Sequence, residues 1–319
     1  MTGVSDLPFR QTASDLGAAY VATEMVACAE FSRGRPDVVR RSAVGEGLPL
    51  MVVQLVGREA RYVAEGARLA AEAGAQIIDL NMGCPAKEVT GSLCGSALMR
   101  DLDLAESLIA AAVDATDCPV TVKMRLGWDD AARNAPELAA RAQRAGARAV
   151  TVHGRTRCQF YTGAADWAAV AAVKAEVTIP VVVNGDVTDA ASARAALEQS
   201  GADAVMLGRG VTGRPWIAAA IEAALDGEAY APPTPGALLE TAVVQLRRSI
   251  DFYGQRLGVR MFRKHLAAYV EQAPWEAPQA GSPDDRRAAR ARLCRLDDPV
   301  QIEAGLADQW RCETQRLAA

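Results

Sequence analysis

The 319-residue sequence lacks the long apolar runs that cross membranes. A membrane-spanning helix needs about 18 or more consecutive apolar residues, and no such stretch occurs. The first residues, MTGVSDLPFRQ, also lack the basic-then-apolar order of a secretion signal. We therefore expect a cytoplasmic protein that does not bind a membrane.

Histidine is scarce and cysteine is scattered. The only histidines are His153 and His265, and the seven cysteines are an odd number without Cys-x-x-Cys spacing. The cysteines are Cys28, Cys84, Cys94, Cys118, Cys158, Cys294 and Cys312. This pattern predicts reduced thiols and no metal site, because a chain of this size needs no disulfides and zinc ligands recur at short spacing.

Positive charge is also in short supply, since the net charge is −4. Residues 1–231 carry 22 Lys/Arg against 28 Asp/Glu, whereas residues 232–319 carry 13 against 11. The basic part of the second region includes RMFRKH, with Arg260, Arg263 and Lys264, and RRAARARLCR. A solvated helix face explains either cluster alone, and a nucleic-acid contact is the alternative.

Short β-branched runs alternate with alanine-rich segments of helical period, a pattern typical of parallel βα units. The expected strands are AYVAT, LMVVQLV, QIIDLNM, PVTVKMR, AVTVHGR, PVVVNGD and DAVMLGR. The expected helices cover residues 58–74, 101–117, 135–146, 167–176, 189–201 and 215–226. After YAPPTPG only helical patterns remain, so we expect one domain over residues 1–231 and a small all-α domain over residues 232–319.

Polar or glycine-rich groups follow six of the seven strands at their C-terminal ends. An open doubly wound sheet gathers its ligand groups at one switch point, whereas a (β/α)₈ barrel spreads them around its mouth. The sequence therefore predicts an α/β TIM barrel. Because only seven strands are legible before the helical region, we expect the first strand to be missing or truncated, with Met1 an internal methionine.

Glycines follow the last two expected strands in PVVVNGDV and DAVMLGRGVTGRPW. In barrels, the loops at this place bind phosphate through backbone N–H groups. Gly208, Gly210 and Gly213 have the spacing of a dinucleotide fingerprint, but a proline-rich loop follows where that fold needs a strand with an acidic end. A mononucleotide phosphate such as that of FMN fits better, and simple tight turns are the alternative.

Lys123 and His153 end two successive expected strands. Together they suit an electron-rich, anionic group such as a reduced flavin, although each residue alone has an ordinary structural explanation. Cys84 lies between Gly83 and Pro85 in a turn after a third strand. Neither histidine is an obvious base for a nucleophile there, so we interpret Cys84 as a general acid. Cys94, ten residues later, is the competing candidate.

These motifs resemble the tRNA-dihydrouridine synthase family. The likeness rests on MTGVSDLPFR, VQLVG, IIDLNMGCPAKEVTGSLCGSALM, VTVKMRLGW, VTVHGRTR, IPVVVNGDV, ADAVMLGRGVTGRPWI and RMFRKHLAAYV, in that order. It extends from Met1 to about Val270 and is greatest to the bacterial B-type branch. The resemblance implies an enzyme that uses FMN, recharged by NADPH, to reduce uridine in tRNA to 5,6-dihydrouridine, and it makes Cys84 the proton donor to C5 of the uracil.

The resemblance also implies binding residues. Those for the flavin are Met1, Thr2, Gln54, Lys123, His153, Asn184, Gly185, Asp186, Gly208 and Arg209. Those for the substrate are Asn81 beside the uracil, Arg125 and Arg155 near the flavin or tRNA, and Arg260, Arg263 and Lys264 on tRNA phosphates. Of the family's initial strand and its APM turn, only Met1, Thr2 and Gly3 remain, so we expect weak flavin retention or poor folding, which an upstream extension would correct.

Two other functions stay open on the sequence alone. A flavin-barrel dehydrogenase of the dihydroorotate or dihydropyrimidine type would share the phosphate pocket and act on a free base without needing the basic helical region. A tRNA-binding protein without catalysis would bind no flavin. We expect a monomer with tRNA as its partner.

Overall fold

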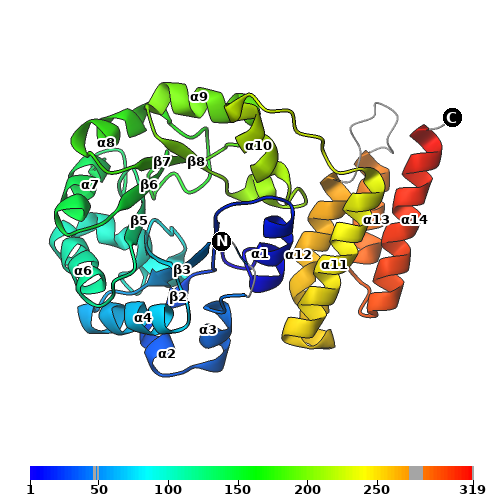
Figure 1. Ribbon diagram of the computed structural model, residues 1–319, viewed down its shortest axis with the longest axis horizontal. Helices are drawn as coiled ribbons and strands as arrows, with labels where there is room; N and C mark the ends of the chain where they lie inside the picture. Colours follow the sequence, from blue (N-terminus) through cyan, green and yellow to red (C-terminus); the bar gives the residue numbers. More distant parts are fainter. Residues whose placement is uncertain (46–47, 49, 273–282, 318–319) are drawn as a thin grey trace. The chain divides into compact units, whose positions relative to one another are not determined.

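The computed structural model describes residues 1–45, 48, 50–272 and 283–317 of the chain, with side-chain detail absent for 283–285 and 309–317. The described chain forms two compact units (Figure 1). We call Met1 with Ala19–Gly210 the barrel unit, and Thr2–Ala18 with Val211–Ala319 the helical unit. The division expected after residue 231 stays a prediction.

The barrel unit is built on a parallel sheet. Its strands are β1 (Val21–Ala22), β2 (Val26–Ala27), β3 (Met51–Val56), β4 (Ile77–Met82), β5 (Val120–Arg125), β6 (Ala149–His153), β7 (Val181–Asn184) and β8 (Ala204–Met206). They are paired in the order β1-β3-β4-β5-β6-β7-β8, and β2 also pairs with β3. All seven expected strands are confirmed, and within the described residues β8 does not pair with β1.

The two faces of this sheet differ in polarity. Val53 of β3, Ile78 of β4 and Val122 of β5 are completely buried and apolar. The alternate positions carry polar residues in register: Gln54 pairs with Asp79, and Asp79 with Thr121. Because side chains of a strand alternate between its faces, one face of the curved sheet is polar. TIM-barrel interiors are usually filled by apolar layers, so this interior is unusual.

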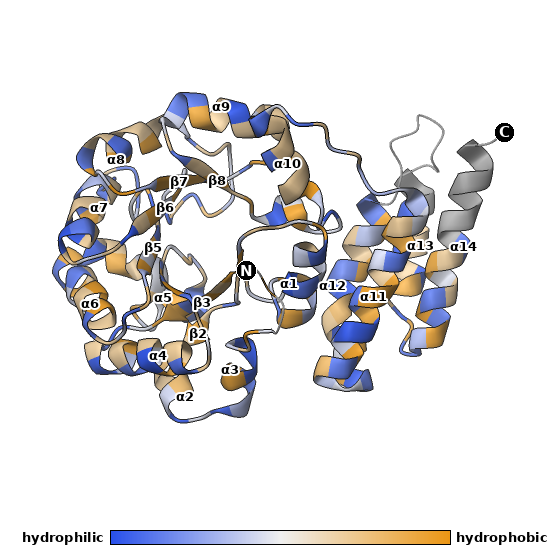
Figure 2. Cartoon of the chain, in the orientation of Figure 1, coloured by the Kyte–Doolittle hydropathy of each residue, from blue (hydrophilic) through white to orange (hydrophobic). Residues whose placement is uncertain are grey.

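Helices surround this sheet (Figure 1). They are α2 (Cys28–Ser32), α3 (Pro36–Arg41), α4 (Ala60–Glu72), α5 (Lys87–Thr90), η1 (Gly95–Arg100), α6 (Leu102–Asp114), α7 (Ala135–Arg144), η2 (Ala168–Val170), α8 (Ala171–Glu176) and α9 (Ala190–Ser200). Figure 2 shows hydrophilic stripes along several of them. Asp101 and Asp189 cap the N-termini of α6 and α9, and Gly201 ends α9 in the left-handed conformation. The helices expected from the sequence are therefore confirmed.

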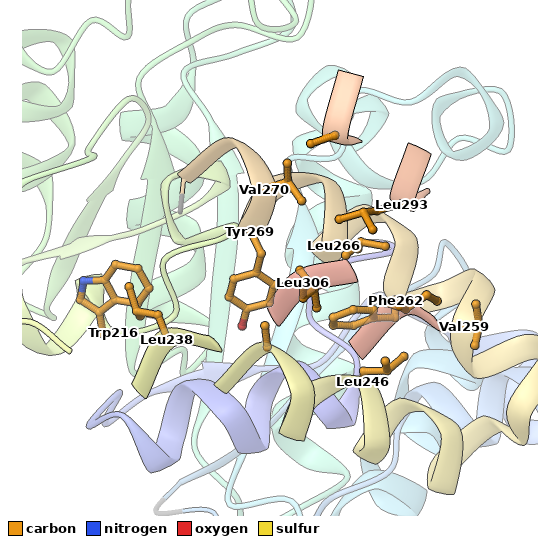
Figure 3. Close-up of a cluster of buried hydrophobic side chains, with 13 residues drawn as sticks. Trp216, Leu238, Leu246, Val259, Phe262, Leu266, Tyr269, Val270, Leu293 and Leu306 are labelled. Carbon is orange, nitrogen blue, oxygen red and sulfur yellow. The ribbon is translucent and has the colours of Figure 1, made fainter. Parts of the chain in front are cut away.

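The helical unit has its own apolar core. It contains α1 (Leu7–Asp15), α10 (Ile217–Asp226), α11 (Pro235–Tyr253), α12 (Gln255–Gln272), α13 (Pro283–Leu293) and α14 (Pro299–Leu317). The short helix η3 (Arg209–Val211) includes the residues at which the barrel unit ends and the helical unit resumes. Leu246, Phe262, Leu266 and Leu306 are almost wholly buried in this core (Figure 3). Nowhere in the described chain is a helix both long enough and apolar enough to traverse a lipid bilayer.

The sequence predicted this architecture, a TIM-barrel-like α/β unit with a C-terminal helical region. The two-residue strand β2 and the short helices α2 and α3 were not predicted. They are too short to show a hydrophobic period in the sequence. In the structure β2 packs on β3, α2 on α4, and α3 on β2 and α2.

Candidate active site at the C-terminal ends of the strands

The polar face of the sheet gathers the predicted site residues of the barrel unit. Parallel strands place all their C-terminal ends at the same edge, where barrel enzymes have their active sites. Residues of β3 to β8 and the loops after them bring together Gln54, Asn81, Cys84, Lys123, Arg125, His153, Arg155, Asn184, Gly185, Asp186, Gly208 and Arg209. The bond from Lys123 Nζ on β5 to Asn184 Oδ1 on β7, 3.0 Å long, crosses the interior past β6.

The loop that carries Cys84 is held by its backbone. Asn81 Oδ1 accepts the N–H groups of Gly83 and Cys84 at 3.2 and 2.9 Å. The N–H and hydroxyl of Ser96 both donate to the Cys84 carbonyl, at 3.1 and 2.8 Å. Arg125 Nε donates to the Gly83 carbonyl at 2.9 Å. These bonds fix the backbone of Cys84 and therefore the place where its side chain is attached.

Cys84 and Cys94 have different charged neighbours. Lys123 and Arg125 lie within electrostatic reach of Cys84. The pKa of Cys94 is raised, mainly by burial and also by Glu30, and the charge that opposes the rise is Arg58. Cys84 is therefore the thiol associated with the cations of the polar interior. Lys87, three residues after Cys84 in the sequence, is exposed at the start of α5.

Lys123 is an ammonium group enclosed by the sheet. Burial is the main cause that lowers its pKa to about 8, and the carboxylate of Asp79 acts in the opposite direction. Its partner Asn184 is itself oriented, because Asn184 Nδ2 donates to the Met206 carbonyl at 2.8 Å. The arrangement presents a cation beside fixed amide groups, which suits an anionic or electron-rich ligand.

His153 is a neutral imidazole. Burial, followed by the charges of Lys123, Arg125, Arg155 and Arg209, lowers its pKa to about 2. Arg155 Nη1 lies 3.3 Å from His153 Nε2. A guanidinium group can only donate, so His153 Nε2 accepts and the ring proton is on Nδ1.

Arg155 ties the loop after β6 to the loop after β7. Its guanidinium makes two bonds to the Asp186 carboxylate, 2.5 and 3.0 Å long, and Asp186 also accepts the N–H of Ala165 at 2.8 Å. Partial burial acts to raise the pKa of Asp186, but the bond from Arg155 and the other donors lower it overall. Asp186 has a φ of +55°, which these bonds stabilise.

Arg125 and Arg155 are 1% and 2% exposed, and both guanidinium groups bond backbone carbonyls. Both therefore order the loops around the site. Their expected contacts with tRNA or flavin stay predictions.

Gly185 is required by close packing. Its φ is +117°, and a Cβ there would lie 2.8 Å from the His153 ring and from the Ala165 side chain. Around Gly208 there is more room, because a Cβ would meet only Asn184 Nδ2 and the sulfur of Met1, both at 3.9 Å. Met1 belongs to the barrel unit, whereas Thr2 belongs to the helical unit. The expected flavin contacts of these residues stay predictions.

The sequence did not single out Tyr161 or Asp79. Tyr161 is 51% exposed, with the guanidinium groups of Arg125 and Arg209 at 5.4 and 4.6 Å from its ring centre. The sequence pattern that could have drawn attention to Tyr161 is an aromatic residue in an arginine-containing loop after His153. Asp79 is 2% exposed and bonds Gln54 and Thr121. A carboxylate inside a buried apolar strand was its signal.

In the helical unit, Arg260 and Arg263 line an open concavity of about 910 Å³. Tyr253, Gly254, Gln255, Arg256, Leu257 and Asp297 complete the lining. Arg256 and Arg260 are exposed and make no ion pair within the described residues, whereas Arg263 pairs with Asp297. Lys264 is exposed on the same helix, α12.

The site is built from amides, cations, glycines and one thiol. In the part of the chain that the structure describes, no group of three or more His, Cys, Asp or Glu residues is placed to hold a metal ion. The neutral His153, the partly buried ammonium of Lys123 and the space at Gly208 fit a flavin mononucleotide. Its ring is electron-rich when reduced, and its phosphate needs close backbone approach.

Comparison with known proteins agrees with these features. A family model described as dihydrouridine synthase (Dus) matches residues 1–284. A probable tRNA-dihydrouridine synthase of Rhodobacter capsulatus is 52% identical over 304 residues, which cover 94% of this chain and 90% of that protein. The tRNA-dihydrouridine synthase B of Xanthomonas axonopodis pv. citri is 44% identical over 279 residues, covering 87% of this chain and 84% of that protein.

Solved structures share the fold at low sequence identity. A 6-hydroxypseudooxynicotine amine oxidase from Pseudomonas geniculata is 14% identical, with a TM-score of 0.54 over 69% of this chain and 44% of that chain. Histamine dehydrogenase from Rhizobium sp. 4-9 is 12% identical, with a TM-score of 0.54 over 82% of this chain and 46% of that chain. With the polar barrel interior, the Cys84 loop and the family match over most of its length, this chain belongs to the dihydrouridine synthase family.

Proposed function

We propose that this protein reduces uridine in tRNA to 5,6-dihydrouridine, with FMN as cofactor and NADPH as the reductant. The observation that carries the proposal is the Cys84 loop. Backbone bonds hold it at the end of β4, beside the cations Lys123 and Arg125 of a polar barrel interior. A weak acid at this place can deliver a proton to a carbon that is becoming basic.

The cofactor would be held by groups at the ends of β3 to β8. Gln54, Lys123, His153 and Asn184 would bind the ring, with Lys123 and the Nδ1–H of His153 as donors to its electron-rich edge. The loops at Gly185 and Gly208, with Asp186 and Arg209, would hold the ribityl phosphate. When bound and reduced, FMN supplies the hydride that C6 of the uracil receives.

Cys84 completes the reduction. The hydride at C6 leaves an enolate at C5 and O4 of the pyrimidine, and the Sγ–H of Cys84 protonates C5, so that the C5=C6 double bond is lost. The resulting thiolate is stabilised by the nearby charges of Lys123 and Arg125. Asn81 lies in β4, just before the Cys84 loop, and its amide would bind the edge of the uracil.

The helical unit supplies the contact with tRNA. Exposed Arg256 and Arg260, which make no ion pair within the described residues, lie in a concavity that also contains Tyr253. Such a surface suits a phosphate backbone, because each cation releases a counterion when it binds phosphate. Arg260 and Arg263 would bind there, and Lys264, exposed on the same helix outside this lining, would add a further phosphate contact. The target uridine must leave its stack to reach the interior of the barrel.

The experiment replaces Cys84 with Ala and measures dihydrouridine formation in tRNA by mass spectrometry. We expect the product to fall below about 1% of the wild-type rate, because general acid catalysis contributes about 10²-fold or more, while flavin absorbance per protein stays unchanged. Cys94→Ala is the matched control and should keep nearly full activity.

Equal product from the Cys84→Ala and wild-type proteins would contradict the role of this thiol. Turnover of free uracil without turnover of tRNA would contradict tRNA as the substrate. Failure of the purified protein to bind added FMN would contradict the cofactor.

A further inference from the structure

A chain of side-chain hydrogen bonds leads from the middle of the barrel interior to the Cys84 loop. Gln54 Nε2 donates to Asp79 Oδ2 at 2.7 Å. Asn81 Nδ2 donates to Gln54 Oε1 at 2.9 Å. Asn81 Oδ1 then accepts the backbone N–H groups of Gly83 and Cys84. The side chains of Gln54 and Asn81 therefore each donate a hydrogen bond through their NH₂ group and accept through their oxygen.

The donor-to-acceptor direction of this series of hydrogen bonds is fixed at its Cys84 end. Backbone N–H groups can only donate, so Asn81 must turn its oxygen toward Gly83 and Cys84. Its NH₂ group then points to Gln54, which must present its oxygen and turn its own NH₂ group away. The residue that meets the Gln54 NH₂ group must be an acceptor.

Asp79 is that acceptor. It is 2% exposed in the middle of β4, and its other oxygen accepts the hydroxyl of Thr121 at 2.7 Å. The register pairs Asp79 with Gln54 on one side and with Thr121 on the other, so backbone pairing places all three side chains at one level of the barrel. Burial raises the pKa of Asp79. In either protonation state its Oδ2 can accept from Gln54, because the Thr121 hydroxyl can donate to the other oxygen or accept from it.

We infer that Asp79 is a positioning residue: it accepts the NH₂ group that Gln54 must turn away from Asn81, and so holds Gln54, Asn81 and the backbone of the Cys84 loop in place. Asp79 does not meet the loop itself and acts through the two amides. The inference rests on the proposed function only for what the Cys84 thiol does. The direction of the hydrogen-bond chain stands independently of it.

The hydrogen-exchange rates of the Gly83 and Cys84 backbone amides measure directly how well Asn81 holds them. In Asp79→Leu, Gln54 loses its acceptor and either orientation of its amide becomes accessible. We expect exchange of these two amides to become about tenfold faster, which corresponds to one lost hydrogen bond. In Asp79→Asn the amide oxygen can still face Gln54 while its NH₂ group faces the Thr121 hydroxyl, so exchange should change less than about threefold.

Two further variants test the direction. Thr121→Val removes the other bond to Asp79 and leaves the chain to Cys84 intact, so exchange at Gly83 and Cys84 should not change. Gln54→Glu places a second carboxylate against Asp79 and should speed exchange. The double variant Gln54→Glu with Asp79→Asn restores a donor opposite an acceptor and should return exchange to near the wild-type rate.

We expect the kinetics of the 319-residue enzyme to change in the same order as the exchange rates. Asp79→Leu should lower kcat for dihydrouridine formation by about tenfold without changing KM for tRNA, and Asp79→Asn should largely restore it. If Asp79→Leu does not fold, the comparison of Gln54→Glu with the double variant decides the question. Unchanged exchange in Gln54→Glu, or a double variant no better than Gln54→Glu, would overturn the inference, whatever the outcome for Cys84→Ala.

Discussion

His265 makes the helical unit sensitive to acid. It is 2% exposed on α12, its ring stacks on Phe9 with centroids 5.1 Å apart, and Phe262 lies at 6.4 Å. Its Nδ1 atom is buried without a hydrogen-bond partner among the described residues. Burial, followed by the charge of Lys264, lowers its pKa to about 4, although the backbone of Val4 accepts a bond that favours the charged form.

The sign of the effect follows from the two pKa values. The pKa of His265 is about 6.5 in the unfolded chain and about 4 in the folded protein. Between these values the unfolded state binds a proton that the folded state does not, so stability falls as the pH falls. The stabilisation is complete above about pH 6.5 and is lost at about 1.4 kcal/mol per pH unit below it, or about 2 kcal/mol by pH 5.

The assay compares wild-type protein with His265→Gln by urea unfolding at pH 7 and pH 5, followed by circular dichroism. The variant cannot titrate at this position, so its loss of stability between the two pH values should be smaller than the wild-type loss by about 2 kcal/mol. His153, whose pKa is lowered, and Asp79, whose pKa is raised by burial, titrate equally in both proteins, so their contributions cancel. Equal losses in wild type and variant would refute the reasoning.

Two other substitutions test the close packing at the site and the contact with tRNA. Gly185→Ala places a Cβ 2.8 Å from the His153 ring at a φ of +117°. We expect the free energy of unfolding to fall by about 2 kcal/mol or more. An unchanged urea midpoint would contradict the close packing. Arg260→Glu should raise KM for tRNA about tenfold, leave kcat unchanged and reduce the salt dependence of binding. Arg148→Glu, an exposed residue just before β6, is its control, and an equal effect there would exclude the helical-unit concavity.

Most of the strands and helices could be predicted from the sequence, because each has a strong local pattern of residue types. The strand PVTVKMR became β5 and PVVVNGD became β7, since β-branched runs fit a buried parallel sheet. The ends of α9 follow from Asp189 and Gly201, whose capping roles depend only on neighbouring residues. The pieces β1 and β2 lie along the same neighbour, β3, which only pairing over a long sequence distance could reveal.

The sequence alone determined which chemical groups stand at the strand ends, including Cys84, Lys123 and His153, because strand ends follow from the local pattern. Only the tertiary structure decided how these groups act on one another. The direction of the Asp79–Gln54–Asn81 chain depends on register between strands more than 20 residues apart in sequence. The neutral state of His153 depends on burial and on cations from several loops. Hydrogen-bond partners and local electrostatics are properties of packed neighbours, and the linear order of residues does not specify them.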